Sequence, residues 1–261
     1  MVLFSGMNSS AQQDSGFHFY KKYDYKISSF TVNSLGEIYF IDQNNQLKKF
    51  NEKGDSVGVF NEVTQYGQLS YVEADNPWKT LLYYKNFSTI VLLDKYLKPI
   101  TNINLRKKNI FRATAVIPSY DNNMWVFDEQ NSKIVKINDE GNVLMETVDL
   151  RTIFDSVPSP IQMVDRDGYL YLYDPQKGLY VFDHFGTFKN RLPFTHWRSL
   201  FVNGKNIYGI DDECLYKYTG NSLTLKKYDL PVAFRGFTSI RIANNKIYLL
   251  KNNQLDIYQF N

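Results

Sequence analysis

Four aspartates stand at the same position in four similar segments, each at the end of an apolar and aromatic run. They are Asp42, Asp128, Asp174 and Asp211. A ring of carboxylates could bind a cation such as Ca²⁺, which prefers oxygen ligands. The turn position favours a structural role instead, because an aspartate that begins a polar turn accepts hydrogen bonds from backbone N–H groups two residues further on. We therefore predict no bound metal and no cofactor.

A second set of candidates consists of arginines that follow an aromatic residue. The pairs are Phe111-Arg112, Trp197-Arg198 and Phe234-Arg235. Several guanidinium groups at one mouth of the molecule would suit a carboxylate or phosphate group. Aromatic residues such as Trp197, Trp78, Tyr66 and Tyr71 could stack on sugars or anchor a protein partner. The alternative is a set of solvated loop charges that pair with the aspartates.

Motifs of nucleophilic, phosphate-binding and zinc chemistry are absent from the sequence. It has no Gly-x-Ser-x-Gly, Gly-x-x-x-x-Gly-Lys or His-Glu-x-x-His pattern. Asp165-x-Asp167-Gly168 starts like a calcium loop but lacks the later ligands, so we interpret it as a tight turn between strands. His184 and His196 have no evident carboxylate partner, and neither is predicted to be catalytic.

Composition excludes several other classes of protein. The chain has 261 residues, of which 43% are hydrophobic, 22% charged and 16% aromatic, and its net charge is +3. So small an excess of basic residues argues against a nucleic-acid binder. The single cysteine, Cys214, cannot form an intrachain disulfide, and we interpret it as a packed strand residue. No run of 18 apolar residues exists, so no transmembrane segment is predicted.

The first residues resemble the end of an export signal. Val2 to Met7 is apolar and small, and Ser9 and Ala11 are small residues at positions −3 and −1 of a cleavage after Ala11. We interpret residues 1–12 as the remnant of such a signal and residues 13–261 as a single domain, exported to the periplasm or cell envelope. The alternative is an ordinary N-terminus.

The elements that must position these residues repeat along the chain. Six apolar and aromatic segments recur every 37–46 residues, each followed by a polar turn and a partner strand. They begin at Ile38, Leu81, Met124, Leu170, Ile207 and Ile247, and their partners run over 47–50, 90–93, 134–137, 179–182, 215–218 and 255–258. Four short strands in about 40 residues, repeated, are typical of a β-propeller blade.

The last repeat ends after its third strand, at Phe260. The run from Phe17 to Tyr25 has strand character and precedes the first repeat. Pairing this run with the last strand would close the ring and remove two exposed edges. We therefore predict an all-β, six-bladed propeller of four-stranded antiparallel blades, in which an N-terminal strand completes the last blade.

The pattern resembles the six-bladed β-propellers with NHL-type and TolB-like repeats. The likeness covers residues 17–261 and rests on strand rhythm and on the Tyr-x-x-Asp segments at 39–42, 171–174 and 208–211, with Trp125 to Asp128 as a variant. Lys85 and Lys251 replace the aspartate in two repeats. The resemblance implies an architecture and leaves activity open, since propellers serve as enzymes, receptors and scaffolds.

We interpret the chain as a non-catalytic protein-interaction propeller rather than an enzyme. The N-terminus resembles export signals of Bacteroidota, whose exported propellers include a plug-like subunit of the type 9 secretion assembly in the outer membrane. A protein partner is predicted on the face that carries the aspartates, Arg112, Arg198, Arg235 and Trp197. The alternatives are a metal-dependent lactonase or hydrolase, and a binding protein for an anionic small molecule or glycan.

Overall fold

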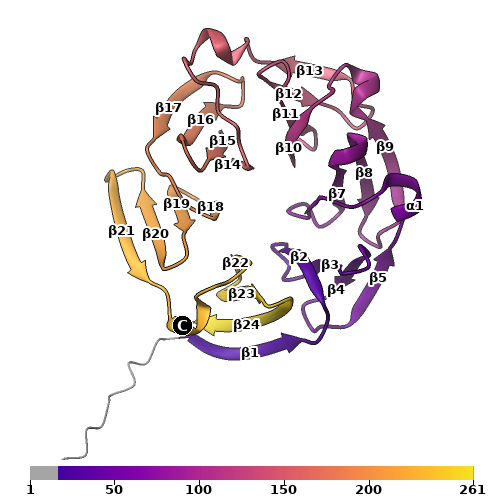
Figure 1. The fold of residues 1–261 in the computed structure, drawn as a ribbon, viewed down its shortest axis with the longest axis vertical. Helices are drawn as coiled ribbons and strands as arrows, with labels where there is room; N and C mark the ends of the chain where they lie inside the picture. The colour runs from indigo at the N-terminus through magenta and orange to yellow at the C-terminus, as the bar shows by residue number, and fades with distance from the viewer. Residues whose placement is uncertain (1–16, 261) are drawn as a thin grey trace, which may run out of the picture.

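The computed structural model describes residues 17–260, and the predicted remnant of an export signal at residues 1–12 lies outside them. The described chain forms six four-stranded antiparallel sheets, arranged around a common axis (Figure 1). In five sheets the strand order follows the sequence from the axis outwards. This arrangement is a six-bladed β-propeller, as the strand rhythm predicts.

Blades one to three take up residues 27–146. Their strands are β2 (Ile27–Val32), β3 (Ile38–Asp42), β4 (Leu47–Phe50) and β5 (Ser56–Phe60); β6 (Tyr71–Glu73), β7 (Lys79–Tyr84), β8 (Thr89–Asp94) and β9 (Pro99–Asn104); and β10 (Ala113–Pro118), β11 (Met124–Asp128), β12 (Lys133–Ile137) and β13 (Val143–Glu146). All six predicted partner strands are confirmed: one coincides with β4, and the others fall within β8, β12, β16 (Gly178–Asp183), β20 (Cys214–Thr219) and β24 (Gln254–Phe260).

Blades four to six follow in the same way. Their strands are β14 (Gln162–Arg166), β15 (Tyr169–Asp174), β16 (Gly178–Asp183) and β17 (Phe188–Leu192); β18 (Ser199–Asn203), β19 (Asn206–Ile210), β20 (Cys214–Thr219) and β21 (Thr224–Asp229); and β22 (Ser239–Ala243), β23 (Lys246–Lys251), β24 (Gln254–Phe260) and β1 (Phe17–Tyr23). Helix within residues 17–260 is confined to α1 (Val63–Tyr66) and short 3₁₀ turns at Lys85–Phe87, Leu105–Lys108, Leu150–Thr152 and Val232–Phe234.

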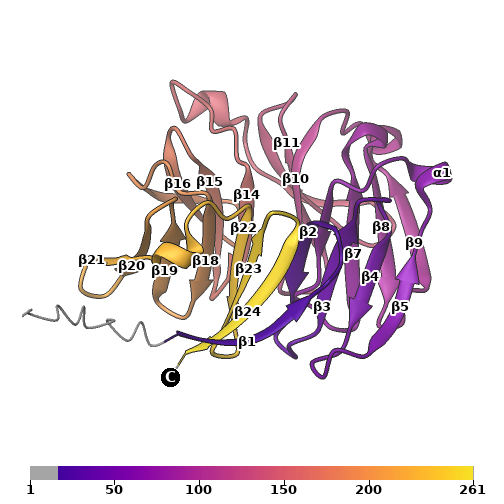
Figure 2. The ribbon, with the colours of Figure 1, turned by 60° about the horizontal axis from the view of Figure 1, so that its bottom comes forward.

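The N-terminal strand closes the ring as predicted. Strand β1 pairs antiparallel with β24, from Phe17 opposite Phe260 to Tyr23 opposite Leu255 (Figure 2). The side chain of Tyr23 is buried and packs against the rings of Phe40 and Phe50 in blade one. The strand therefore ties the last blade to the first by hydrogen bonds and by a shared core.

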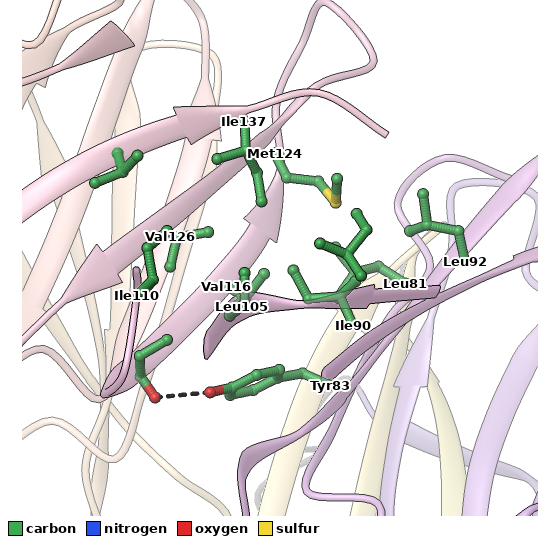
Figure 3. Close-up of a cluster of buried hydrophobic side chains, with 13 residues drawn as sticks. Leu81, Tyr83, Ile90, Leu92, Leu105, Ile110, Val116, Met124, Val126 and Ile137 are labelled. Atoms are coloured by element: carbon green, nitrogen blue, oxygen red, sulfur yellow. Dashed lines mark hydrogen bonds between the residues drawn. The ribbon is translucent and has the colours of Figure 1, made fainter. Parts of the chain in front are cut away.

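The hydrophobic core is divided among the blade interfaces. Each pair of neighbouring blades encloses its own cluster of buried side chains. Between blades two and three, for example, Leu81 and Ile90 meet Val116 and Met124 (Figure 3). The hydroxyl of Tyr83 crosses the same interface and donates to the carbonyl of Ala113 at 2.9 Å. Apolar burial of this kind fixes each blade against the next.

The antiparallel order gives the ring two different faces. The connection face carries the blade-to-blade connections and the turns between second and third strands, where Asp42 and its three counterparts stand. The hairpin face carries the turns between first and second strands and between third and fourth strands. The central channel runs between the two faces and is lined by the innermost strands, β2, β6, β10, β14, β18 and β22.

Candidate functional site

The four repeated aspartates hold their own turns on the connection face. The Oδ1 atom of Asp42 accepts hydrogen bonds from the backbone N–H groups of Asn44 and Gln46 at 2.9 and 3.0 Å. Equivalent bonds reach Asp128 from Asn131, Asp174 from Gln176 and Lys177, and Asp211 from Glu213 and Cys214. Each carboxylate thus stabilises the turn that follows its strand, in the manner that the turn position favours.

The three predicted arginines lie on the connection face in separate connections. Arg112 pairs with Glu129 at 2.5 Å, and Arg198 pairs with Asp212 while its guanidinium lies 4.8 Å from the ring centre of Phe237. Arg235 is exposed. The structure places each beside a different blade interface, so no two of them share an ion-pair partner among the residues described.

Trp197, which was predicted on the same face, lies in the core beneath it. Its side chain is buried, stacks with the rings of Phe194, Tyr173 and Tyr216, and lies over Gly209. A Cβ atom at Gly209 would approach the indole to 1.9 Å. The absence of a side chain at this strand position is what makes room for the ring. The indole is therefore part of the core between blades four and five.

His184 has a carboxylate partner, contrary to the expectation from sequence. Its Nε2 atom lies 2.8 Å from Oδ1 of Asp165, and its ring stacks on Tyr120 with centroids 4.0 Å apart. Asp165 lies near the end of β14 and His184 lies in the turn between β16 and β17, and antiparallel pairing brings these two positions to the same end of the blade four sheet. Nineteen residues separate them in sequence, so spacing alone did not reveal the pair.

Asp165 is the centre of a buried hydrogen-bond network on the hairpin face. Its Oδ2 atom accepts from the hydroxyl of Ser119 and from the indole N–H of Trp125, both at 2.8 Å. Its side chain is only 1% exposed. The tight turn between β14 and β15 is present, as predicted, but it consists of Asp167 and Gly168 alone. Asp165 is instead a residue of β14, and it joins blade four to blade three.

The central channel contains a second set of charged groups that the sequence analysis did not single out. Near the hairpin face, a hollow of about 180 Å³ is lined by residues from all six innermost strands. Its charged members are Glu73, Asp75, Asp165, Arg166 and Arg241. Asp75 and Arg166 form an ion pair at 2.7 Å that links blade two to blade four across the mouth.

Glu73 is the most perturbed carboxyl group in this channel. Burial raises its pKa to about 7, and the nearby charge of Asp75 acts in the same direction. The hydroxyl of Tyr71 donates to Glu73 at 2.7 Å and Arg241 lies near enough to act on it, and both oppose the shift. A carboxyl with such a pKa exchanges its proton near neutral pH, a property that often marks functional sites.

A signal for these residues was present but weak. Arg241 lies between Ile240 and Ile242 in the apolar stretch before the segment that begins at Ile247, and strand alternation points its side chain away from theirs. Glu73 lies on β6, which has only three residues and mixes polar with apolar side chains. That strand was not identified from the sequence, and its channel-facing carboxyl was missed with it.

Large apolar side chains are exposed along the hairpin face of blades one to four. They are Leu35, Trp78, Tyr96, Tyr120 and Phe185, with exposed fractions of 56%, 67%, 58%, 66% and 81%. We call these five residues the aromatic arc. Leu35, Trp78 and Tyr96 line one hollow of about 160 Å³. Tyr120 stacks on His184, the residue next to Phe185, so Tyr120 and Phe185 belong to neighbouring turns.

The described residues were also compared with the requirements of a metal site and of a membrane-spanning helix. No three histidine, cysteine, aspartate or glutamate side chains in residues 17–260 are grouped so that they could hold a metal ion. Within the same range, no helix is both long and apolar enough to cross a membrane.

Comparison with known proteins supports the architecture. No family model matches the sequence, and no curated protein matches it. Among solved structures, the chain is similar to virginiamycin B lyase from Staphylococcus aureus, with a TM-score of 0.63 and 15% identity over 91% of this chain and 82% of that one. It is also similar to BBS1N, solved in complex with ARL6DN, with a TM-score of 0.62 and 12% identity over 95% and 98% of the two chains.

A third similar structure is the extracellular domain of BT4673 from B. thetaiotaomicron. The TM-score is 0.58 and the identity 15%, over 89% of this chain and 33% of that one. These proteins share the propeller fold and differ in what their names describe, from a lyase to an extracellular domain. The chain is thus a six-bladed β-propeller, and its role has to be argued from its own residues.

Proposed function

We propose that this protein is a non-catalytic interaction propeller that holds a protein partner against the aromatic arc of its hairpin face. The observation that carries the proposal is the exposure of five large apolar side chains on one side of a rigid ring. Exposed apolar patches rimmed by polar residues commonly mark protein interfaces, and tryptophan and tyrosine are frequent anchors there.

The arc is held in place by the structure beneath it. Lys95 lies over the rings of Trp78 and Tyr96, with its Nζ atom 4.8 and 4.9 Å from their centres. Under this group the buried Nζ atom of Lys49 donates to the carbonyl of Lys95 at 2.8 Å and pairs with Glu37 at 2.9 Å. Anchors that are ordered before binding lose little conformational entropy when a partner docks.

The partner that we propose is a subunit of an outer-membrane secretion assembly of type 9, which this protein would join as an accessory or plug-like component. The small residues before Gln12 support export to the periplasm or cell envelope, as in exported Bacteroidota propellers with NHL-like or TolB-like repeats. The likeness to an extracellular domain and to a propeller solved with a bound protein is consistent with this role.

Affinity purification of the tagged protein from its native cell envelope tests this function. We expect the assembly to co-purify with the wild type and to be lost at least tenfold in the double variant Trp78→Ala/Tyr96→Ala. Phe111→Ala, which removes an exposed ring from the connection face, is the matched control and should retain the assembly. Equal recovery with both variants would contradict the proposal.

The connection face supports a second candidate function, binding of an anionic small molecule or glycan. Arg112 is largely exposed although it pairs with Glu129, and Arg235 is exposed as well. Binding of such a ligand would have to fall in the variants Arg112→Ala and Arg235→Ala. A lactonase or hydrolase activity would require a metal in the channel, and metal analysis of the purified protein tests that alternative.

A further inference from the structure

The hollow in the central channel is lined by charged and by apolar side chains. Blades two and six, which flank blade one, contribute the carboxyl of Glu73 and the guanidinium of Arg241. Blades three, four and five contribute apolar side chains, which include Ile117, Val164 and Phe201, and blade four also contributes Gln162, Asp165 and Arg166. A molecule in this hollow would therefore meet both opposite charges and apolar side chains.

Arg241 has donors to spare at this position. Its Nη1 atom donates to the hydroxyl of Ser199 at 2.9 Å and lies 3.5 Å from the carbonyl of Ile240. Within residues 17–260, Arg241 forms no ion pair, so its guanidinium and the Glu73 carboxylate stand more than 4.0 Å apart. Both groups line the same hollow, and the charge of Arg241 acts to lower the pKa of Glu73.

The charged side chains that line the hollow determine which kind of ligand it can bind. With Glu73 ionised, three carboxylates, Glu73, Asp75 and Asp165, and two guanidinium groups, Arg166 and Arg241, line the hollow. Asp75 pairs with Arg166, and Asp165 is bound by Ser119, Trp125 and His184. Glu73 and Arg241 are therefore the two charged groups left without an ion pair among the residues described. A simple anion would meet repulsion from the carboxylates, and a simple cation would meet repulsion from the guanidinium groups. A ligand that carries both charges can satisfy Arg241 and Glu73 together.

We propose that this hollow binds a small zwitterion, an α-amino acid with an apolar side chain, whose carboxylate pairs with Arg241 and whose ammonium group pairs with Glu73. The side chain lies against Ile117, Val164 and Phe201. The volume of about 180 Å³ suits a molecule of this size. The ion pair between Asp75 and Arg166 is half exposed at the mouth, and such pairs are weak enough to open.

Binding should be coupled to the proton on Glu73. The ammonium group of the ligand favours the ionised carboxylate, whose pKa in the free protein is about 7. The groups that face Glu73 are Tyr71 and Asp75 from its own blade and Arg241 from blade six. Affinity should therefore rise about tenfold between pH 6 and pH 8, as the fraction of ionised Glu73 increases.

Isothermal titration with three matched probes tests the proposal. The probes are L-leucine, 4-methylpentanoate, which lacks the ammonium group, and 3-methylbutylamine, which lacks the carboxylate. We expect L-leucine to bind with a Kd of about 1 mM or below at pH 8, and each single-charge probe to bind at least tenfold more weakly. Failure of L-leucine to bind, or equal binding of a single-charge probe, would overturn the proposal.

Variants of the channel residues locate the binding. Glu73→Gln should weaken L-leucine binding at least tenfold and remove its dependence on pH, and Arg241→Lys should weaken it as well. Glu140→Gln and Arg191→Gln alter exposed residues outside the channel and should bind as the wild type does. Unchanged binding in a folded Glu73→Gln protein would contradict this site. The result is independent of the partner-binding face, because none of these substitutions touches the aromatic arc.

Discussion

The carboxylates of this propeller fall into two groups with different partners. Asp42, Asp128, Asp174 and Asp211 recur at equivalent positions on the connection face and accept from backbone N–H groups of their own turns. Asp165 and Glu73 occur once each, near the hairpin face, and take part in contacts with other blades or with the channel. The repeated aspartates therefore stabilise their own turns, whereas the carboxyl groups that occur only once contribute to contacts specific to this protein.

The same contrast holds for the aromatic side chains. Rings that occupy the repeated second strands, such as Tyr39, Trp125 and Tyr173, are fully buried between blades. Trp78, Tyr120 and Phe185 stand in turns, where the repeat places no common residue type, and they are exposed. The exposed rings of the turns thus differ from blade to blade, and those on the hairpin face are where we place the partner.

The largest expected effect separates the two groups of carboxylates. Asp165→Ala should lower the free energy of unfolding by about 3 kcal/mol, because it leaves the buried donors of Ser119 and Trp125 without an acceptor. Asp174→Ala removes a turn cap and should cost about 1.5 kcal/mol. Urea denaturation measures both. A greater loss for Asp174→Ala would break the comparison.

A second substitution tests the close packing of Gly209 against Trp197 at the interface between blades four and five. Gly209→Ala places a methyl group against the indole of Trp197 and should destabilise the protein by about 2 kcal/mol. Gly220→Ala in the same blade meets only an ordinary contact with the carbonyl of Lys205 at 3.5 Å and should stay within about 0.5 kcal/mol of the wild type. Thermal unfolding of the two variants measures this difference. Similar melting temperatures for Gly209→Ala and Gly220→Ala would contradict the close packing at Gly209.

The ionisation of Glu73 gives a smaller effect with a defined sign. Its pKa is raised in the folded protein, so its favourable contribution is complete below about pH 4 and is lost as the pH rises through about 7. Glu73→Gln lacks this loss and should gain on the order of 1–2 kcal/mol relative to the wild type between pH 5 and pH 8. Unfolding curves at the two pH values test it, and a constant difference would contradict it.

The smallest effect concerns Asp121 on the hairpin face. Burial would raise its pKa, but hydrogen bonds from Lys136, Asn123 and Ser119 outweigh burial and lower the pKa to about 2. Its contribution to stability is therefore present above about pH 4 and is lost as the pH falls towards 2. Asp121→Asn should flatten acid unfolding in that window by a few tenths of a kcal/mol, since the ion pair is partly exposed. A parallel acid profile would contradict this assignment.

The architecture could be predicted because the same pattern of strands and turns occurs in each of the six repeats. Apolar alternation and polar turns recur along the chain, and the strand character of Phe17 to Tyr25 predicted the closing strand β1. The tight turn at Asp167 and Gly168 was also correct: both residues have positive φ, which a two-residue hairpin turn requires.

The channel and the histidine pair depend on contacts that no single repeat contains. Asp165 meets Trp125 from another blade, and Glu73 comes near Arg241 only when the ring is closed. Such distances follow from the curvature and register of the whole assembly, which short motifs do not encode. The aromatic arc has the same origin, since its members come from separate turns of four blades.

The most direct test of the central claim asks which face touches the partner. A photoreactive phenylalanine analogue can be placed at Phe185 on the hairpin face or at Phe111 on the connection face, both of which are exposed. After illumination of intact cells, mass spectrometry of the tagged protein identifies the cross-linked product. We expect a cross-link to a subunit of the outer-membrane assembly from position 185 and none from position 111. A product from position 111 alone would contradict it.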